Sequence, residues 1–229
     1  MLYIFQKWVR LLSYHKVPFN YHQLLRGDSI LIDFQRKKQI YIIIQGSLKL
    51  SKIFTNQEIL TLGIFTENDI INELEHIVHN KNYYYIAETL TTTSIISCNY
   101  EKIAYWIYQD ANICYEIILA YQKYTQKIIL MMQVLAHRDK KSRLIHLLLL
   151  LCQQFGCKTK LGIVIPIIIT QNTLATIIGS NRITITRIIQ SLQKSQLISI
   201  YHHKMVIHNL ISLSNYNKYS LRYKNKLNS

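Results

Sequence analysis

Glycine and proline are scarce in this chain, which has 6 Gly and 2 Pro among its 229 residues. Flexible linkers and disordered chains are rich in these residues, so the composition argues against both. Long apolar runs are also missing, because the longest, at 147–152, is too short to span a bilayer. Gln6, Lys7 and Arg10 interrupt the N-terminal segment, which therefore does not resemble a secretory signal. We expect a soluble, intracellular protein that does not bind membranes, with a core built from its 49% hydrophobic residues.

Cysteine and histidine occur without the spacing of a metal site. The cysteines form no CxxC pair and are expected to be free thiols in a reducing compartment: Cys98, Cys114, Cys152 and Cys157. A metal enzyme of the cupin type needs a His-x-His and carboxylate cluster, yet no histidine occurs between His22 and His76. Glycine-rich phosphate loops and a nucleophile elbow are missing too. We expect neither a metal nor catalysis, and a cupin-type metal enzyme is the least favoured alternative.

Acidic residues are almost absent from the C-terminal part of the chain. Residues 1–137 contain 13 basic and 11 acidic residues, whereas residues 138–229 contain 14 basic residues and a single acid, Asp139. The net charge of +15 therefore divides into +2 and +13. Such a one-signed field attracts a polyanion, and no Lys/Arg block lies beside an amphipathic membrane anchor. We expect double-stranded DNA as the partner, bound at one operator or, alternatively, coated without sequence preference.

The segment 170–198 predicts a helix-turn-helix. Thr170 is a suitable N-cap for its first helix, and Gly179 can adopt the positive φ of a sharp turn. In the second helix, four apolar residues with helical spacing form one buried stripe: Ile185, Ile188, Ile189 and Leu192. The opposite face carries Arg182, Ile183, Thr186, Arg187 and Gln190. Arginine can bind guanine in a bidentate way and an apolar side chain can contact the thymine methyl, so this face is typical of a DNA-recognition helix. The alternative is an ordinary helical hairpin with a solvated basic face.

The N-terminal half predicts short strands. Apolar and β-branched stretches occur at 29–34, 40–44, 47–54, 58–65, 83–93 and 94–99. Turn-forming pairs separate them at 27–28, 45–46 and 55–56. This spacing indicates an antiparallel β-roll or jelly roll.

A long helix is predicted at 110–137. It carries a heptad seam with alternating spacings of four and three: Ile117, Tyr121, Tyr124, Ile128, Met131 and Leu135. The seam predicts a homodimer through this helix, and the alternative is packing on the chain's own β-roll. Because Ile118, Ile129 and Met132 widen the stripe, both contacts remain open. A symmetric dimer would place two recognition helices ~34 Å apart and select a palindromic site.

In this order, β-roll, long helix and helix-turn-helix resemble the CRP/FNR superfamily of transcription regulators. The matching stretches are residues 27–28, 45–50, 72–74, 174–175 and 179–187. Within the superfamily, the chain is similar to the cyanobacterial nitrogen-control regulators (NtcA type) and their plastid-encoded homologues. That similarity rests on residues 135–139, 142–144, 197–200 and 206–208 and on Lys204.

The resemblance implies an α+β fold in two domains. Residues 1–137 would form a β-roll of the cyclic-nucleotide-binding type with its dimerisation helix, and residues 138–229 a winged helix-turn-helix. It further implies a homodimeric activator of nitrogen-controlled genes in the plastid stroma or in a bacterial cytoplasm. RNA polymerase is an implied partner, with the basic loop 156–162 as the candidate contact.

The resemblance also assigns roles to residues of the DNA-binding domain. Arg182, Ile183 and Arg187 would read bases. The apolar Ile183 matches the nitrogen regulators and favours a palindrome with GTA and TAC arms. Residues that would bind phosphates and set the register are Gln171, Ser180, Asn181, Thr184, Thr186 and Lys204. His202 and His203 would form the turn of a β-hairpin wing, close to solvent or phosphate rather than to a metal.

The effector pocket is where the sequence departs from the family. By alignment its positions are Asn72, Glu73, Leu74, Tyr83, Tyr84, Tyr124 and Lys127. Relatives hold a cyclic nucleotide or 2-oxoglutarate with arginines, but this chain has no arginine between Arg36 and Arg138. A buried dianion needs paired cations, and lysine lacks the bidentate fork of arginine. The sequence argues against a cyclic nucleotide and leaves open 2-oxoglutarate, a different signal or no effector.

Overall fold

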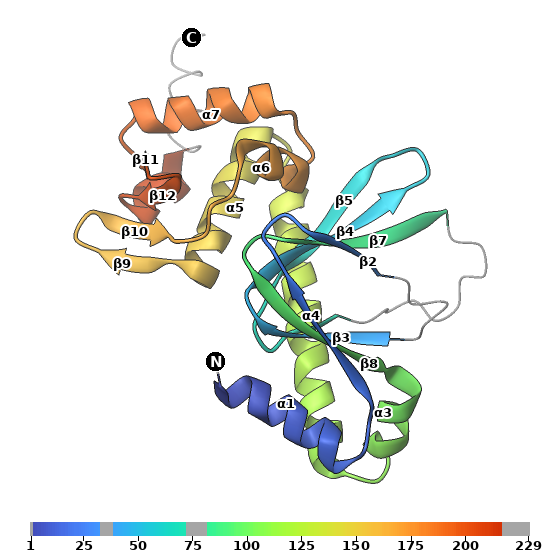
Figure 1. The fold of residues 1–229 in the computed structure, drawn as a ribbon. Helices are drawn as coiled ribbons and strands as arrows, with labels where there is room; N and C mark the ends of the chain where they lie inside the picture. The colour runs from blue at the N-terminus through green and yellow to red at the C-terminus, as the bar shows by residue number, and fades with distance from the viewer. Residues whose placement is uncertain (1, 33–38, 72–81, 217–229) are drawn as a thin grey trace. The chain divides into compact units, whose positions relative to one another are not determined.

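A computed structural model describes residues 2–32, 39–71 and 82–216 of the chain, with side chains from Lys7 onward (Figure 1). The chain divides into two compact units, Met1–Ile129 and Leu130–Ser229. Helix α4 (Ala111–Ala136) passes through this division, and the predicted domain boundary at 137–138 lies directly after its end. None of the helices in the described ranges is long and apolar enough to cross a membrane.

The first unit is a β-roll of two four-stranded sheets, in agreement with the predicted fold class. Its strands are β1 (Phe19–Leu24), β2 (Ser29–Ile32), β3 (Gln39–Gln45), β4 (Ser47–Phe54), β5 (Ile59–Thr66), β6 (Ile70–Ile71), β7 (Tyr83–Thr89) and β8 (Thr93–Asn99). One sheet has the order β1-β8-β3-β6 and the other β2-β7-β4-β5, and all these pairings are antiparallel. The edge strands are β1 and β6 in the first sheet and β2 and β5 in the second.

Strand β3 explains how the roll and the helices share a core. Its isoleucines alternate between two clusters, because successive side chains of a strand point to opposite faces. Ile42 packs in a cluster with Trp8 of α1 (Leu2–Tyr14) and Ile117 of α4. Ile43 packs inside the roll with Leu48 and other residues of the second sheet. The strand is therefore buried on both faces, which accounts for its nearly continuous apolar sequence.

Two helices of this unit were not predicted from the sequence, α1 and α3 (Tyr100–Ile107). Helix α3 begins directly after β8, because the Asn99 side chain accepts hydrogen bonds from the amides of Glu101 and Lys102 at 2.8 and 3.3 Å. This cap satisfies two of the donors that a helix start leaves without partners. The helix contributes Ile103 to the cluster around Trp8.

The second unit is a winged helix-turn-helix. It contains α5 (Lys140–Phe155), β9 (Cys157–Thr159), β10 (Gly162–Ile165), α6 (Gln171–Ile178), α7 (Arg182–Lys194), β11 (Ile198–Tyr201) and β12 (Lys204–Ile207). Its sheet has the order β11-β12-β10-β9. The prediction of a basic loop at 156–162 is wrong, because this segment forms a tight hairpin in which β9 pairs with β10 and Cys157 lies opposite Val164. The hairpin nevertheless presents its lysines, Lys158 and Lys160, to solvent.

Candidate nucleic-acid interface

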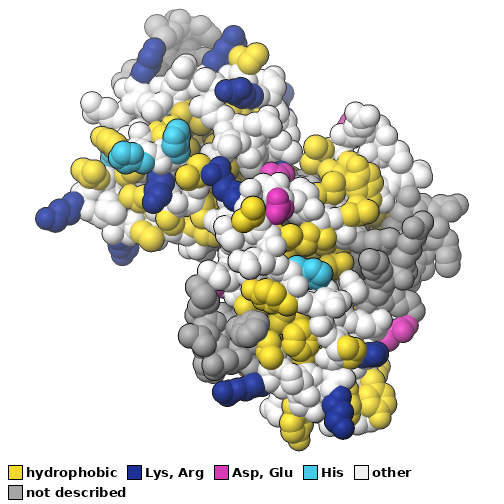
Figure 2. Space-filling model, in the orientation of Figure 1, with side chains coloured by type: hydrophobic (Ala, Val, Ile, Leu, Met, Phe, Trp, Pro, Cys, Tyr) yellow, Lys and Arg dark blue, Asp and Glu magenta, His cyan; other side chains and the backbone are white. Residues whose placement is uncertain are grey.

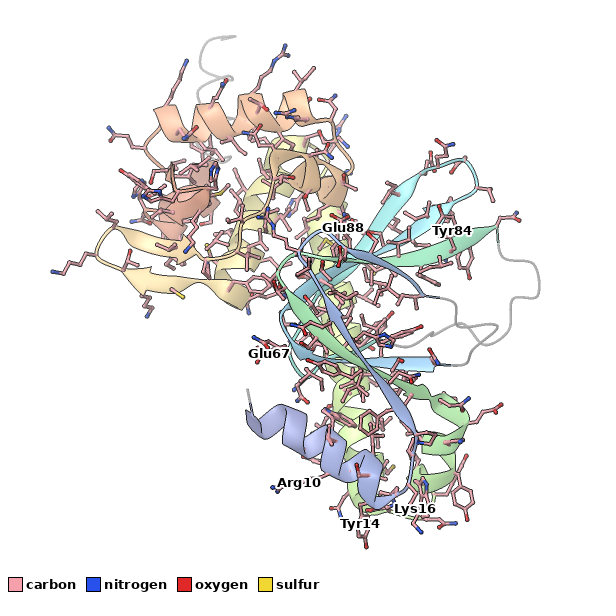
Figure 3. All side chains as sticks on the ribbon, in the orientation of Figure 1. Arg10, Tyr14, Lys16, Glu67, Tyr84 and Glu88 are labelled. Carbon is pink, nitrogen blue, oxygen red and sulfur yellow. The ribbon has the colours of Figure 1, made fainter. Side chains whose placement is uncertain are left out.

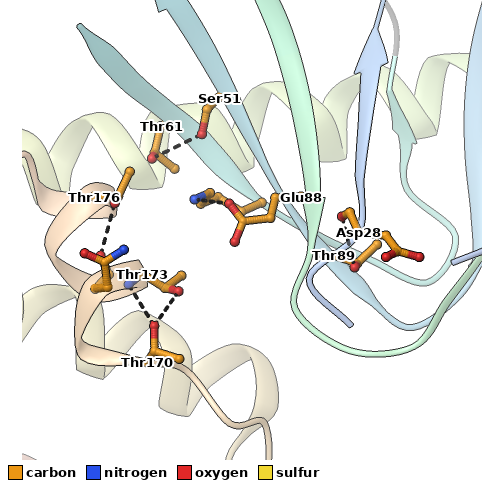
Figure 4. A network of polar contacts seen from close by, with 10 residues as sticks. Asp28, Ser51, Thr61, Glu88, Thr89, Thr170, Thr173 and Thr176 are labelled. Carbon is orange, nitrogen blue, oxygen red and sulfur yellow. Dashed lines mark hydrogen bonds and ion pairs between the residues drawn. The ribbon is translucent and has the colours of Figure 1, made fainter. Parts of the chain in front are cut away.

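Helix α6 begins and ends as its sequence predicts. Thr170 is the N-cap: its hydroxyl accepts a hydrogen bond from the amide of Thr173 at 3.0 Å (Figure 4). At the other end Gly179 adopts the left-handed conformation, with φ 62° and ψ 54°, and the amide of Ser180 donates to the carbonyl of Ala175. This arrangement reverses the chain without a side chain at the left-handed position.

Two cations of α5 hold the end of α6, a contact that sequence reasoning missed. Arg143 donates from Nη1 to the carbonyl of Ile178 at 3.2 Å and from Nε to the carbonyl of His137 at 2.8 Å. Lys140 donates to the carbonyl of Gly179. Carbonyls at a helix C-terminus carry partial negative charge, so these cations stabilise the turn before the recognition helix. Not every basic residue of this unit is therefore available to DNA.

The predicted stripe and the predicted DNA face of α7 lie on opposite sides of the helix. Ile185, Ile189 and Leu192 are at most 1% exposed, and Ile188 is half-buried. Arg182, Ile183, Arg187 and Gln190 are exposed, with 65% of Ile183 accessible. At ~100° per residue these four positions and Thr186 fall within a sector of roughly 140°. In the described ranges neither guanidinium of this face has an ion-pair or hydrogen-bond partner within the chain.

Asn181 starts α7 and fixes its direction. Its side chain accepts a hydrogen bond from the amide of Thr184 at 2.8 Å. Two residues of the predicted phosphate set bond to each other, because the Thr186 hydroxyl lies 2.5 Å from Oε1 of Gln171. This contact ties α6 to α7 and leaves the amide nitrogen of Gln171 as its donor toward a phosphate. Ser180 is half-buried in the turn.

The wing is a two-residue hairpin between β11 and β12. Tyr201 pairs with Lys204, and the turn residues His202 and His203 both have positive φ, 47° and 62°. Two consecutive left-handed residues define a type I′ turn, in which Asn-Gly is the preferred pair. The wing therefore presents Lys204 and two exposed imidazoles.

The single acid of the C-terminal part is used as a helix cap. Asp139 accepts hydrogen bonds from the amide and the hydroxyl of Ser142 at 2.8 and 2.5 Å. Burial raises the pKa of Asp139, but these hydrogen bonds outweigh it, so the pKa lies below its usual value. On the face drawn in Figure 2, several Lys and Arg side chains lie over α7 and at the tip of the β9–β10 hairpin. This surface has the charge that a phosphate backbone requires.

The heptad seam was assigned to the wrong face of α4. Its members are directed into the chain's own core rather than toward a partner: Ile117 and Tyr121 pack in the cluster around Trp8, and Tyr124 and Ile128 pack inside the roll. Met131 is 1% exposed and Leu135 is half-buried. For Ile117, Tyr121, Tyr124 and Ile128, the structure therefore shows the alternative, packing on the chain's own β-roll. The physical reason is that the more apolar of two possible faces covers the open side of the roll.

A second face of α4 remains exposed and has the same spacing. It carries Tyr115, Ile118, Gln122, Thr125, Ile129 and Met132, spaced three, four, three, four and three residues apart. The four apolar members are between 48% and 63% exposed. A 3.5-residue repeat of exposed apolar positions is the pattern of a two-stranded coiled coil.

Among the predicted effector residues that the structure describes, Tyr124 and Lys127 lie beside the Phe65 ring, whereas Tyr83 and Tyr84 lie on β7. Asn72, Glu73 and Leu74 lie outside the described residues. Tyr84 projects from β7 with 48% of its surface exposed (Figure 3), whereas its neighbour Tyr83 faces the other side of the sheet. There the ammonium of Lys52 lies 3.5 Å from the centroid of the Tyr83 ring. Tyr124 stacks on Phe65, with ring centroids 5.2 Å apart.

Lys127 already has an internal counter-ion. Its ammonium pairs with the carboxylate of Asp69 and donates to the hydroxyl of Thr66 at 2.9 Å. Burial lowers the pKa of Lys127, against the opposing effect of the Asp69 charge. A second lysine of the roll, Lys49, pairs with Glu88 at 2.7 Å. An anionic effector would have to displace these carboxylates to use either lysine.

All four cysteines are free in the structure. Burial raises the pKa of Cys98 to about 12 and that of Cys152 to about 11, so neither is reactive at neutral pH. Cys157 is exposed in β9. Across the described ranges, no three His, Cys, Asp or Glu side chains are grouped in a way that could hold a metal ion.

Comparison with known proteins agrees with this architecture. Residues 142–216 match the Crp-like helix-turn-helix domain, and residues 21–109 match the cyclic nucleotide-binding domain. A Porphyra purpurea protein described as an HTH-type transcriptional regulator (ycf28) is 31% identical over 90% of this chain and 86% of that protein. The global nitrogen regulator of Synechococcus elongatus is 28% identical over 87% of this chain and 90% of that protein.

The fold alone is shared with solved structures of lower identity. A CooA mutant from Carboxydothermus hydrogenoformans superposes with a TM-score of 0.70 at 13% identity, over 89% of each chain. A β-roll of the cyclic-nucleotide-binding type followed by a Crp-like helix-turn-helix defines a DNA-binding transcription regulator. The chain belongs to the Crp-type family of regulators that includes the Porphyra protein.

Proposed function

We propose that this protein is a homodimeric activator of nitrogen-controlled genes that binds a palindromic operator. The observation that carries the proposal is the exposed face of α7, where Arg182, Ile183 and Arg187 project without partners in the described part of the chain. The similarity to global nitrogen regulators over most of both chains supports the nitrogen-controlled target genes.

The residues around this face support sequence-specific rather than uniform binding. Arg187 and Arg182 offer bidentate donors for guanine, and Ile183 offers an apolar contact for a thymine methyl. Asn181, Gln171 and Lys204 lie on elements whose positions are fixed by caps, the α6–α7 bond and the wing hairpin. Phosphate contacts from such fixed elements set the register in which base readers act.

The dimer in this proposal uses the exposed face of α4. Two copies related by a two-fold axis would pair Ile118, Ile129 and Met132 with their counterparts, burying side chains that are about half exposed in one chain. Gln122 and Thr125, at the intervening positions, are polar. A polar residue in a coiled-coil seam favours one register at some cost in stability.

In this proposal, the effector to which the regulator responds differs from that of the relatives whose pockets contain arginines. The ion pair of Lys127 with Asp69 favours a regulator that answers a different ligand or none, since it neutralises the cation nearest the predicted pocket. 2-Oxoglutarate remains the ligand to test first, because of the similarity to nitrogen regulators. No catalytic role is part of the proposal.

The proposed location is the plastid stroma, or else a bacterial cytoplasm, on the resemblance to plastid-encoded and cyanobacterial regulators. RNA polymerase is the proposed protein partner of the activator. The lysines of the β9–β10 hairpin, Lys158 and Lys160, are the candidate contact, because they are exposed at its tip.

Selection of bound sites from random DNA, with and without 2-oxoglutarate, tests the function. We expect enrichment of one palindrome with GTA and TAC arms. Enrichment that does not depend on 2-oxoglutarate would support an effector-independent regulator. Bound DNA without any enriched sequence would contradict the proposal and indicate a protein that coats DNA.

A further inference from the structure

A small polar cavity lies between α1, the β5–β6 turn and α4. Its volume is about 120 Å³ and its lining residues are Lys7, Trp8, Asn68, Glu116, Leu119, Ala120 and Lys123. The four residues of α4 lie on one face of the helix, because they are spaced three, one and three residues apart. Trp8 and Ala120 belong to the cluster on the outer side of β3, so the cavity lies outside the interior of the roll. It shares no residue with the predicted effector pocket.

The cavity has an excess of positive charge. Lys7 pairs with Glu116 at 2.5 Å. Lys123 is exposed at the rim and has no ion pair among the described residues. One turn further along α4, Lys127 pairs with Asp69. The cavity itself is therefore lined by two cations, Lys7 and Lys123, and one carboxylate, Glu116. Glu67, on the same turn as Asn68, projects from the roll and does not line the cavity (Figure 3).

The amide of Asn68 adds fixed donors to this charge. Its Oδ1 accepts a hydrogen bond from the indole of Trp8 at 2.8 Å, and its backbone amide donates to the carbonyl of Ile43 at 2.8 Å. The residue has a positive φ of 64°, a conformation that asparagine adopts readily in turns. With Oδ1 occupied, the Nδ2 protons have no acceptor in the part of the chain that is described.

We propose that this cavity binds a small anion, a carboxylate or phosphate of about five or six non-hydrogen atoms, held by Lys123, Lys7 and the amide of Asn68. The size follows from comparison with a 150 Å³ cavity that holds benzene. Trp8, Leu119 and Ala120 provide an apolar wall for the carbon skeleton of a carboxylate. The proposal does not depend on the DNA-binding function.

Lys127, one turn from Lys123 on α4, also experiences the excess positive charge near the cavity. Burial lowers the pKa of Lys127, Asp69 opposes this, and the positive charge of Lys123 lowers the pKa further. A bound anion beside Lys123 would screen that repulsion. It would also join α1 to α4 on the side next to the exposed face of Tyr115, Ile118 and Gln122. Binding would therefore stabilise the helix that carries the proposed dimer contact.

Isothermal titration calorimetry of the full chain at constant ionic strength tests the site, with inorganic phosphate in one arm and pyruvate in the other. We expect saturable binding in at least one arm, and the arm that binds identifies the source of the anion. Lys123→Gln should weaken it at least tenfold. Lys102→Gln is the matched control, because Lys102 is an exposed lysine of α3 that does not line the cavity. It should leave the affinity unchanged.

A third variant gives an effect of the opposite sign. Glu116→Gln releases Lys7 and removes a competing carboxylate, so the anion should bind several-fold more tightly. Weaker binding by Glu116→Gln would overturn the assignment. So would the absence of saturable binding in both arms, or an equal loss in Lys102→Gln and Lys123→Gln, which would indicate a general charge effect.

Discussion

Truncation of one exposed isoleucine should weaken the dimer without unfolding the chain. Ile129 is 48% exposed on α4 and becomes buried in the proposed coiled coil. Full burial of an isoleucine side chain is worth about 1.5–3 kcal/mol, so the exposed half contributes about 1 kcal/mol per copy. A symmetric dimer contains the residue twice. Ile129→Ala should therefore cost about 2 kcal/mol of association free energy, a roughly 30-fold increase in the dimer Kd.

Sedimentation equilibrium measures this constant, and the adjacent residue supplies the control. Ile128 packs inside the β-roll, so Ile128→Ala should lower the free energy of unfolding by about 2 kcal/mol and leave the dimer Kd unchanged at a temperature where the variant is folded. The reasoning is refuted if Ile129→Ala dimerises like the unmodified chain. It is also refuted if Ile128→Ala is the variant that dissociates while remaining as stable as the original.

Substitutions at three further positions test the helix-turn-helix and the connection before it. Gly179→Ala should lower the free energy of unfolding by roughly 1–2 kcal/mol in urea titration, because a left-handed conformation disfavours a side chain while the new Cβ would lie no closer than 3.9 Å to Arg143. A decrease in the free energy of unfolding of more than about 4 kcal/mol would contradict this prediction, because it would require a steric clash that the structure does not show. Asn181→Ala removes the cap of α7 and should cost about 1 kcal/mol in the same titration, whereas Asn181→Asp should retain most of it. The pKa of His137 lies below its ordinary value of 6.5, first because of burial and then because of the charge of His146, whose ring stacks on it at 3.7 Å. As the pH falls through 6.5, His137 is protonated in the unfolded chain before it is protonated in the folded chain, so the free energy of unfolding decreases. The Tm of His137→Gln should therefore fall less than that of the unmodified chain between about pH 7.5 and 5.5.

The recognition helix could be predicted from the sequence because its determinants are local. Thr170, Gly179 and Asn181 each act through bonds to residues within four positions, and such caps and turns are properties of the residue itself. The strand 47–54 was likewise predicted with the bounds of β4, since β-branched and apolar residues between two turns define it.

The seam of α4 could not be predicted, because two faces of this helix share one spacing. The buried face includes Ile117 and Tyr124, and the exposed face includes Ile118 and Ile129. Which face packs on the roll depends on contacts with residues such as Phe65, about sixty positions away. The periodicity of one helix contains no information about such distant contacts. The residue types of the two faces do differ in one way. The exposed face contains the polar residues Gln122 and Thr125, whereas the only polar groups of the buried face are the hydroxyls of two tyrosines.

The sequence also does not predict ion pairs and helix-capping contacts between residues that are far apart in the chain, because local periodicity contains no information about them. Lys127 meets Asp69 across 58 positions, and Lys140 meets the carbonyl of Gly179 across 39. Both lysines had the appearance of available cations in the sequence. Only the fold shows that each one already has an acceptor.

The central claim is that α7 reads bases, and the most direct test compares Arg187→Ala with Lys204→Ala on one selected palindrome, on its single-base variants and over a range of salt. We predict that Arg187→Ala loses about 1–3 kcal/mol on the palindrome and discriminates less at one symmetric base pair. Lys204→Ala should weaken all sequences alike and reduce the slope of log affinity against log salt by about 0.9 per lost contact. If Arg187→Ala preserves the full preference among the variants, α7 does not read bases through this arginine and the account is wrong.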